Sequence, residues 1–409
     1  MNKTAAGLRY SVLGGAGAMG RITVRDLVET AGPRDEIMVA DFDLAGARAL
    51  AASLRDRRVR AVRVDVRDRA GAARALAGTF ALINDAQYQL NPAAMELALA
   101  LRCHYIDLGG LFHVTRRQLG FHRRFLAADR TALLGMGAAP GITNLLARWA
   151  ADGLDTVREI HTRVGSMDRT RYEPAPALAV SYSLKTILEE FSFRPAVFTK
   201  GRLVFVEPMS GDSPHRFPPP VGLRRPMYTL HSELATLVPS FRGLGLREAS
   251  FKIAFDPEFM DRVRFLRDLG LASHEPVEAP CASGRGTVQV APVDVVSKVA
   301  MSQPAGGRKG PLRQYEVIRA VVKGIQRGRK VTRVADCHTA GMPAWGVGLD
   351  IDTGAPPSIA AQMLASGEIT ARGAVAPENA VPPERFFRHL KRRGMTVKTR
   401  RRPGWAFPV

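Results

Sequence analysis

Apolar positions in the first 150 residues follow two different spacings that alternate along the chain. Short runs rich in β-branched and aromatic residues, typical of buried strands, occupy residues 10–13, 36–41, 59–66, 80–85, 103–110 and 131–137. Between these runs the apolar residues recur at helical spacing, as in residues 44–54, and Asn91 followed by Pro92 is typical of a helix start. This alternation predicts an α/β fold with a Rossmann-like, doubly wound parallel sheet in residues 1–150.

The pattern changes after about Asp152. Strand-like segments dominate from there, namely residues 157–165, 195–208, 250–255 and 286–292. The turn at Lys200 and Gly201 is typical of an antiparallel hairpin, and proline-rich stretches divide the region. We therefore expect an α+β domain with an antiparallel sheet in residues 151–343, followed by helical patterns again in residues 344–409.

Glycines stand at G-x-G-x-x-G spacing directly after the first strand-like run. There the unpaired amides and the positive end of the following helix dipole favour an anion. We expect Gly15 to permit the turn, Gly17 to let the backbone approach a pyrophosphate, and Gly20 to let the helix pack closely on the strand. Ala18 and Met19, in the same first turn, are predicted cofactor contacts. The alternative is a structural βαβ turn without a ligand.

The second strand-like run ends in Asp41, about twenty residues after Gly20, where a ribose-binding acid belongs. A carboxylate there can accept hydrogen bonds from both ribose hydroxyls and would repel a 2′-phosphate. NAD is therefore the predicted cofactor. NADP stays the alternative, because Arg48 or Arg55 on the following helix could reach a phosphate.

Ligands of a doubly wound sheet bind outside the carboxyl ends of the strands, so the residues after each apolar run are candidates. Asp65 is a predicted adenine contact or else part of a loop-end salt bridge. Gln87 is a predicted wall beside the nicotinamide or else a solvent-facing polar turn. Asn84 and Pro140 are also predicted to contact the cofactor, and Gly141, where a helix begins, is predicted to contact substrate.

Composition indicates a soluble protein. The chain has 409 residues, 46% of them hydrophobic, with no apolar run long enough to cross a bilayer and no apolar signal core at its start, so we expect no membrane partner. Cys103, Cys281 and Cys337 are widely separated, which predicts neither disulfides nor a metal site and favours a reducing cytoplasm.

The net charge of +21 reflects arginines spread along the chain, with clusters in residues 55–68 and 391–405. No aromatic stacking motif or recognition-helix pattern accompanies them, so a solvated surface is favoured over a nucleic-acid partner. The charge should still concentrate anionic ligands near the protein.

Six spaced motifs resemble those of a known family. They are GGAGAMG (14–20), VADFD (39–43), YIDLGG (105–110), GAAPGITN (137–144), TLHSELAT (229–236) and DTGAPPSIAAQML (352–364). Together they resemble the saccharopine dehydrogenase family, most of all its lysine 6-dehydrogenase branch. The resemblance spans nearly the whole chain. It implies that residues from Ala344 onward fold back onto the Rossmann domain, and that the inserted domain covers the nicotinamide and forms a homodimer.

The resemblance also implies NAD(P)-dependent hydride transfer at a carbon–nitrogen centre of an amine or amino acid, as in lysine 6-dehydrogenase-like oxidative deamination. Such a reaction needs a neutral amine and a nearby base. Asp107 could act as base or position the amine, or equally cap a helix. His231 titrates near neutrality and Glu233 could hold the amine. The alternative for these last two is a polar network at the domain junction.

One departure concerns the substrate. Some relatives carry a polar residue in the segment where this chain has Ala179 and Val180, while Tyr182 and Ser183 remain as predicted substrate contacts. The substrate could therefore differ from lysine or saccharopine. Two further functions stay open: a reductase that condenses an amine with an oxo acid using NADPH, and a cofactor-sensing or nucleic-acid-associated protein that is not an enzyme.

Overall fold

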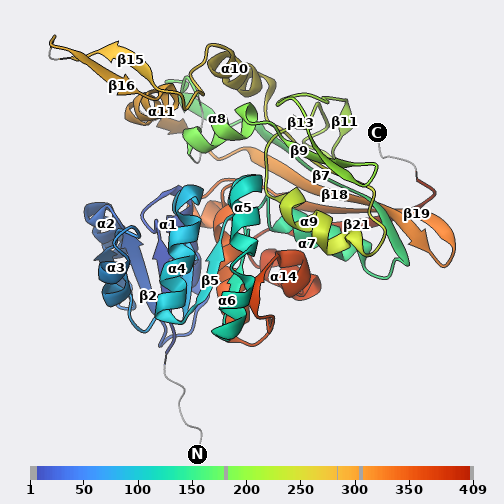
Figure 1. Ribbon diagram of the computed structural model, residues 1–409, viewed down its shortest axis with the longest axis horizontal. Helices are drawn as coiled ribbons and strands as arrows, with labels where there is room; N and C mark the ends of the chain where they lie inside the picture. Colours follow the sequence, from blue (N-terminus) through green and yellow to red (C-terminus); the bar gives the residue numbers. More distant parts are fainter. Residues whose placement is uncertain (1–6, 179–182, 283, 304–306, 406–409) are drawn as a thin grey trace, which may run out of the picture.

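The computed structural model describes residues 7–178, 183–282, 284–303 and 307–405, which form two stacked parts (Figure 1). The first part is built on a parallel seven-stranded sheet in the order β20-β6-β5-β4-β1-β2-β3. Its strands are β1 (Arg9–Leu13), β2 (Glu36–Asp41), β3 (Val59–Arg63), β4 (Ala81–Asn84), β5 (His104–Asp107), β6 (Thr131–Leu133) and β20 (Gly373–Val375). The predicted doubly wound sheet is confirmed.

Helices cover both faces of this sheet. They are α1 (Ala18–Thr30), α2 (Leu44–Leu54), α3 (Arg69–Ala75), α4 (Asn91–Leu101), α5 (Leu111–Leu119), α6 (His122–Ala127) and α7 (Ile142–Ala151), with a 3-10 turn η1 (Tyr88–Leu90). Because alternate side chains of a strand point to opposite faces, Val12 packs with Ile83 in one hydrophobic cluster while Leu13 packs with Leu82 in another. The strands are thus buried on both sides.

The second part is a mixed sheet in the order β10-β9-β14-β7-β18-β19-β21, with β13 beside β14. Its strands are β7 (Thr156–Asp168), β9 (Ala196–Thr199), β10 (Arg202–Phe205), β13 (Met227–Tyr228), β14 (Glu248–Ala254), β18 (Gln314–Gln326), β19 (Arg329–Thr339) and β21 (Thr396–Pro403). The pair β7–β14 is parallel and the other neighbours are antiparallel, including the predicted hairpin at Lys200 and Gly201. The expected α+β domain is confirmed.

Its helices are α8 (Leu184–Ser192), α9 (Glu233–Arg242), α10 (Pro257–Asp268) and α11 (Pro292–Ser302). Short two-stranded pairs join β8 (Arg171–Glu173) with β17 (Gly307–Lys309), β11 (His215–Arg216) with β12 (Leu223–Arg224), and β15 (Val277–Pro280) with β16 (Thr287–Val290). One face of the large sheet, with Ile160, Val164 and Ile318, belongs to the same hydrophobic cluster as Val12. The two parts therefore share one core.

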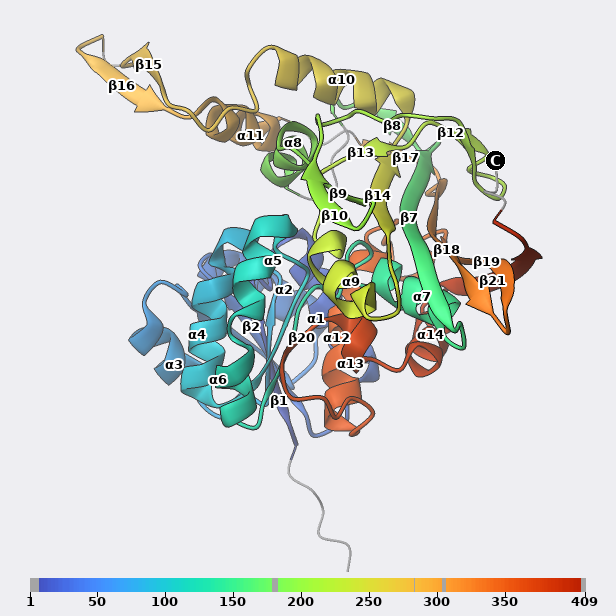
Figure 2. The same ribbon diagram turned by 45° about the vertical axis from the view of Figure 1, so that its right-hand side comes forward.

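The last segment, from η2 to β21, contributes elements to both parts. It forms η2 (Pro343–Trp345), α12 (Ile351–Ala365), α13 (Pro377–Ala380) and α14 (Pro383–Lys391). Helix α12 packs along α1 and β20 extends the first sheet, but β21 then pairs with β19 (Figure 2). This differs from the expectation that everything after Ala344 folds onto the first domain. The strand is held there because Arg400 reaches Asp336 Oδ2 at 2.7 Å and the backbone covers the open edge of β19.

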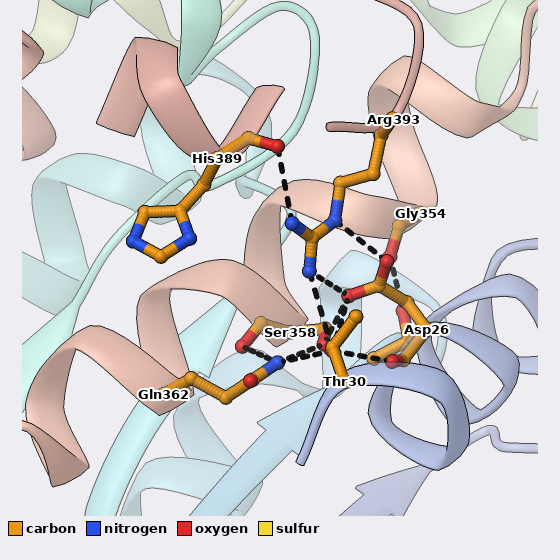
Figure 3. Close-up of polar contacts among 8 residues, drawn as sticks. Asp26, Thr30, Gly354, Ser358, Gln362, His389 and Arg393 are labelled. Carbon is orange, nitrogen blue, oxygen red and sulfur yellow. Dashed lines mark hydrogen bonds and ion pairs between the residues drawn. The ribbon is translucent and has the colours of Figure 1, made fainter. Parts of the chain in front are cut away.

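A buried ion pair joins the two ends of the chain (Figure 3). The Arg393 guanidinium grips the Asp26 carboxylate through Nε–Oδ1 at 2.6 Å and Nη2–Oδ2 at 2.7 Å, and both side chains are almost fully buried. Ser358 of α12 donates to the same carboxylate at 2.6 Å. The fork-on-fork geometry and the additional donor satisfy the buried charges, so α1, α12 and the end of α14 are held as one unit.

No helix in the described part of the chain is both long enough and apolar enough to cross a bilayer.

Replacing Arg393 by methionine leaves the Asp26 carboxylate buried without its counter-charge. We expect the free energy of unfolding to fall by about 3–5 kcal/mol, measured by urea denaturation. Arg388→Met is the matched control, because Arg388 is 62% exposed and lies 3.9 Å from Glu384, so its loss should cost less than about 1 kcal/mol. Equal losses for the two variants would contradict a structural role for the pair.

Candidate functional site

The glycine loop lies between β1 and α1, as predicted, but the structural roles of Gly14 and Gly15 differ from those predicted. The positive φ that favours glycine occurs at Gly14 (+67°), not at Gly15, to which the sequence analysis assigned the turn. Gly15 is instead required for space, because a Cβ there would lie 2.9 Å from both the Val12 carbonyl oxygen and Val39 Cγ1. Gly20 packs helix on strand as expected, since a Cβ would overlap the Gly14 carbonyl.

The first turn of α1 is open to a ligand. Gly17 and Ala18 are exposed, Met19 is buried, and a Cβ on Gly17 would approach the Gly14 carbonyl oxygen at 3.0 Å. The first intrahelical bond runs from the Arg21 amide to the Gly17 carbonyl, so the preceding amides of this turn have no partner four residues earlier within the helix. These amides and the helix dipole fit a pyrophosphate.

Asp41 stands at the carboxyl end of β2, beside the glycine loop. Its Oδ2 accepts the Ala16 amide and its Oδ1 accepts the Asp43 amide, each at 2.9 Å. A carboxylate oxygen can accept more than one hydrogen bond, so this arrangement fixes the group while leaving acceptor capacity for ribose hydroxyls. The adjacent Phe42 ring is 58% exposed, and the guanidinium of Arg63 lies 5.1 Å from its centroid.

Three predicted cofactor contacts lie in different environments. Asp65 forms a two-oxygen ion pair with Arg67, whose hydrogen bonds lower the pKa of that carboxyl, as in the salt-bridge alternative. Gln87 is exposed at the start of η1. Asn84 is buried, and its amide donates to Asn91 Oδ1 at 2.8 Å. A buried network therefore holds Asn84 away from the open loop edge.

Asp85 follows β4 and was not among the predicted cofactor contacts; its backbone lies next to Gly14 of the glycine loop. A Cβ on Gly14 would come 3.0 Å from the Asp85 carbonyl carbon. Both carboxyl oxygens are inaccessible to water. Burial raises the pKa of Asp85 to about 7, against an opposing contribution from the Thr23 hydroxyl. The only sequence signal was its place after a buried strand.

Asp107 ends β5 and is fully buried. Its Oδ1 accepts the amides of Gly109 at 2.9 Å and Gly135 at 2.7 Å, and Gln118 donates to its Oδ2. Burial raises the pKa of Asp107, and these donors oppose the rise. The donors occupy both oxygens and tie two loops together, which argues against the predicted role as proton acceptor and for a role in positioning the loops.

His231 lies between two carboxylates where the two parts of the molecule meet. Its Nε2 is 3.5 Å from Glu190 Oε2 and its Nδ1 is 3.4 Å from Glu233 Oε2, and its ring stacks on Phe251. Burial lowers the pKa of His231, but the two carboxylates outweigh it and raise the pKa to about 10. The expectation that His231 titrates near neutrality is therefore wrong, because the ring serves as a buried cation.

Glu233 occupies the first turn of α9 and is completely buried. Its Oε1 accepts the Thr143 hydroxyl at 3.0 Å, so it bridges α7 of the first part and α9 of the second. The neighbouring Ser232 hydroxyl is 3.3 Å from the Gly110 amide. These contacts place the TLHSELAT motif against the carboxyl end of β5, next to the edge where the glycine loop lies.

Glu189 on α8 is a second acid at this junction that was not predicted as a site residue from the sequence. Its carboxylate lies 2.9 Å from His274 Nε2 and 3.3 Å from Gln89 Nε2, and a hydrogen bond links it to Tyr88. Burial raises the pKa of Glu189, opposed by Tyr88 and His274. No local motif marks it, since neighbouring glutamates on an amphipathic helix are usually solvated.

Two of the three predicted substrate contacts, Gly141 and Ser183, stand at the starts of helices α7 and α8. Gly141 (φ +123°) is buried, and its amide donates to Asn144 Oδ1, while Pro140 packs against Gly109 and Gly135. Ser183 caps α8 by accepting the Thr186 amide. Tyr182, together with Ala179 and Val180, lies outside the described residues.

Three glutamates and one charged histidine thus meet at the junction. We name Glu189, Glu190, His231 and Glu233 the acidic junction. Glu190 and Glu233 flank the imidazolium, and Glu189 interacts with Glu190. The three carboxylates carry more negative charge than His231 offsets when all are ionised, and α8 and α9, which carry them, lie on the side of the second part that faces the first (Figure 1). Such a group favours a cationic ligand over an anionic one. Within the described residues no three His, Cys, Asp or Glu side chains are placed so that they could hold a metal ion together.

Comparison with known families and structures agrees with this architecture. Residues 11–133 match the saccharopine dehydrogenase NADP binding domain, and residues 137–395 match the saccharopine dehydrogenase C-terminal domain. The fold is similar to that of apo saccharopine dehydrogenase (L-Glu forming) from Saccharomyces cerevisiae, with 16% identity, a TM-score of 0.70, and coverage of 97% of this chain and 100% of that one. At this identity the likeness shows a shared fold. The first part is an NAD(P)-binding domain.

A more distant similarity is to DesIV, a dTDP-glucose 4,6-dehydratase from Streptomyces venezuelae with NAD and TYD bound. It has 23% identity, a TM-score of 0.26, and coverage of 31% of this chain and 55% of that one. A match of this size carries no argument about activity.

Replacing His231 by asparagine leaves two buried carboxylates without their counter-charge, so we expect a loss of ~2–4 kcal/mol in unfolding free energy at pH 7. The folded-state pKa of about 10 lies above the ordinary 6.5. The contribution of the charge is therefore fully present below about pH 6.5 and is lost as the pH rises through 10.

The difference between wild type and His231→Asn should shrink when denaturation is repeated from pH 7 to pH 10. His113→Asn, on the exposed side of α5, is the control and should show no such trend. A difference that stays constant over this range would mean that His231 is uncharged in the folded protein.

Proposed function

The chain belongs to the saccharopine dehydrogenase family of NAD(P)-dependent oxidoreductases, and from this premise we propose that it transfers hydride at a carbon–nitrogen centre of an amine or amino acid. The reaction we favour is oxidative deamination of the lysine 6-dehydrogenase kind, with NAD as the preferred cofactor. The observation that carries the proposal is the acidic junction at the boundary between the two parts.

The junction is chemically suited to an amine. An ammonium group placed beside Glu189 would gain charge-assisted hydrogen bonds where burial keeps water away, with Glu190 as a neighbouring negative charge. His231 holds a positive charge between Glu190 and Glu233, which offsets the repulsion between these two acids. Glu189 is the remaining acid, and its partners are Tyr88 and Gln89 of the first part and His274 after α10. A substrate amine could displace one of those partners.

Oxidation at the carbon requires the amine to lose a proton first, because the nitrogen lone pair must assist hydride departure. Glu189 suits this step, since burial raises the pKa of its carboxyl toward neutrality and a hydrogen bond from Tyr88 orients it. The amides of the first α1 turn and Asp41 would hold the dinucleotide, which supplies the hydride acceptor. Asp107 would keep the loops at Gly109 and Gly135 in place beside it.

One observation favours a second candidate, a reductase that joins an amine to an oxo acid with NADPH. The guanidinium groups of Arg63 and Arg67 lie 5.1 and 5.9 Å from the Phe42 ring centroid, directly beyond Asp41. Cations at this position could receive a 2′-phosphate. This candidate uses the same acidic junction for the amine.

The decisive experiment follows NADH and NADPH absorbance with a panel of diamines and amino acids, with and without 2-oxo acids, while free ammonia is assayed. Oxidative deamination predicts NADH formation and ammonia release without a second carbonyl substrate. Oxidation of NADPH that requires both an amine and an oxo acid would favour the condensing reductase. Binding of NADH or NADPH without turnover of any substrate would contradict both proposed reactions and favour a cofactor-sensing protein.

Asp41→Ala should weaken NAD binding about 10-fold or more and leave NADP binding little changed or improved, because the variant loses an acceptor for ribose and a charge that opposes phosphate. Calorimetric titration with each cofactor measures both constants. Asp43→Ala, which alters the α2 cap and leaves the Asp41 carboxylate in place, is the control. An unchanged ratio of the two constants would remove the basis for preferring NAD.

Glu189→Gln tests the amine site while keeping the shape of the side chain. We expect KM for the amine to rise about 10- to 100-fold, since a hydrogen bond to a charged group contributes ~1.5–3 kcal/mol, with NAD affinity unchanged. Glu207→Gln, at a side chain that is 77% exposed, is the matched control and should resemble wild type. Steady-state kinetics that show equal KM values for the two variants would place the amine elsewhere.

A further inference from the structure

A hollow lies where α5 of the first part meets α8 and β10 of the second. Its volume is about 600 Å³, which is in the range of small-molecule sites. In Figure 2, α5 stands below α8 and β10, on the side of the first part that faces the second. The hollow is lined by His113, Ser192, Phe193, Arg194 and Phe205. Both parts of the molecule therefore contribute to its wall.

Aromatic rings form most of this wall. The Phe205 ring stacks on His113, with the ring centroids 5.5 Å apart and the planes 13° apart, and Phe112 meets the Phe205 ring edge-on at 5.5 Å. These contacts hold a ring of the second part against α5. Phe193 supplies another ring and is 37% exposed, although phenylalanine is usually buried. Rings held in this way offer an apolar surface to a ligand.

The charges around the hollow disfavour a second cationic group on the ligand. Among the described residues that line it there is no acid, and Arg194 carries the only formal charge. Arg194 Nε lies 3.5 Å from Glu207 Oε1, and both side chains are largely exposed, so this ion pair stays in water at the rim. The second ammonium of a diamine, or the zwitterionic end of lysine, would leave water here without a buried counter-charge, whereas an apolar group gains free energy by the same transfer.

The hollow lies one helical turn from Glu189 of the acidic junction. Ser192 follows Glu189 by three residues on α8, and residues at this spacing are neighbours on the helix surface. His274 links the two places, because its Nε2 is 2.9 Å from Glu189 Oε1 and its ring centroid is 5.6 Å from that of Phe193. One turn is about 5.4 Å along the axis, a distance that a short carbon linker and a ring can span. An amine held at Glu189 can therefore extend into the hollow.

We propose that this hollow selects the substrate, and that the preferred substrate is a primary monoamine with an aromatic group on a short carbon linker, such as phenethylamine. The inference rests on the proposed function, because it takes the amine to lie at Glu189. In that reaction the ammonium gives a proton to Glu189, the neutral amine gives a hydride to NAD, and water hydrolyses the resulting iminium to an aldehyde and ammonia. The aromatic group takes no part in these steps and contributes binding only.

The test is steady-state NAD reduction with phenethylamine, ethylamine, cadaverine and lysine. KM for phenethylamine should be about 10- to 100-fold below that for ethylamine, which has the same amine without the ring, because a ring is removed from water. Phe193→Ala should raise KM for phenethylamine about 10-fold and leave KM for ethylamine unchanged, since ethylamine does not reach the hollow. Phe265→Ala is the matched control: it removes a ring that is 63% exposed on α10, and should keep both wild-type KM values.

Phe205→Leu, on the other side of the hollow, is a second variant that keeps an apolar side chain and should also raise KM for phenethylamine; thermal melting shows whether each variant is folded. A preference for phenethylamine that persists in both variants overturns the inference, because the ring must then bind elsewhere. A lower KM for lysine or cadaverine than for phenethylamine also overturns it, but leaves the proposed reaction standing.

If no amine is oxidised, the proposed reaction fails and the hollow is tested by binding alone. Calorimetric titration of phenethylamine and ethylamine in the presence of NADH measures whether the ring contributes affinity. Tighter binding of phenethylamine that Phe193→Ala loses and Phe265→Ala keeps supports an aromatic site in the hollow. Equal affinities for the two amines, or no binding of phenethylamine at millimolar concentration, overturn it.

Discussion

The buried ion pair between Asp26 and Arg393 is the constraint on which the arrangement of the molecule depends. Each charge can leave water only because the other is present, with Ser358 adding a further donor. The first domain is therefore complete only when residues beyond 350 have returned to α1. The second sheet is formed from the residues between, with β21 added from the segment after Arg393. The same return seats α12 along α1, the helix whose first turn begins after Gly17.

A second electrostatic constraint operates at the junction of the two parts. Glu190 and Glu233 are both buried, and their repulsion is offset by His231, whose stacked ring lies between them. Burial alone would drive the proton off this ring, but two carboxylates at about hydrogen-bonding range outweigh that tendency. The junction is thus polar and pre-formed, as the proposed oxidation of an amine requires, whereas a simple packing interface between domains would avoid buried charges.

Much of the architecture was predictable because it rests on local patterns. Alternating strand and helix spacing indicated the parallel sheet, the motif at residues 14–20 located the NAD(P) turn, and Lys200–Gly201 located a hairpin. Predictions of the roles of individual residues failed where the role depends on neighbouring atoms from a remote part of the chain. The positive φ belongs to Gly14, whereas Gly15 is needed because Val39 from the neighbouring strand leaves no room for a Cβ, and no spacing rule contains that neighbour.

The same contrast between local patterns and tertiary contacts holds at the candidate site. The sequence by itself determined which residues stand at the carboxyl ends of strands, since hydrophobic periodicity and strand order are properties of short segments. Only the tertiary structure decided their chemical state. Donors from two loops and α5 occupy Asp107, Glu190 from α8 joins the nearby Glu233 in keeping His231 charged, and contacts across the junction single out Glu189 on an otherwise ordinary helix. The physical reason is that burial and electrostatic interaction depend on distance in space, which a chain sets only after its remote segments have packed together.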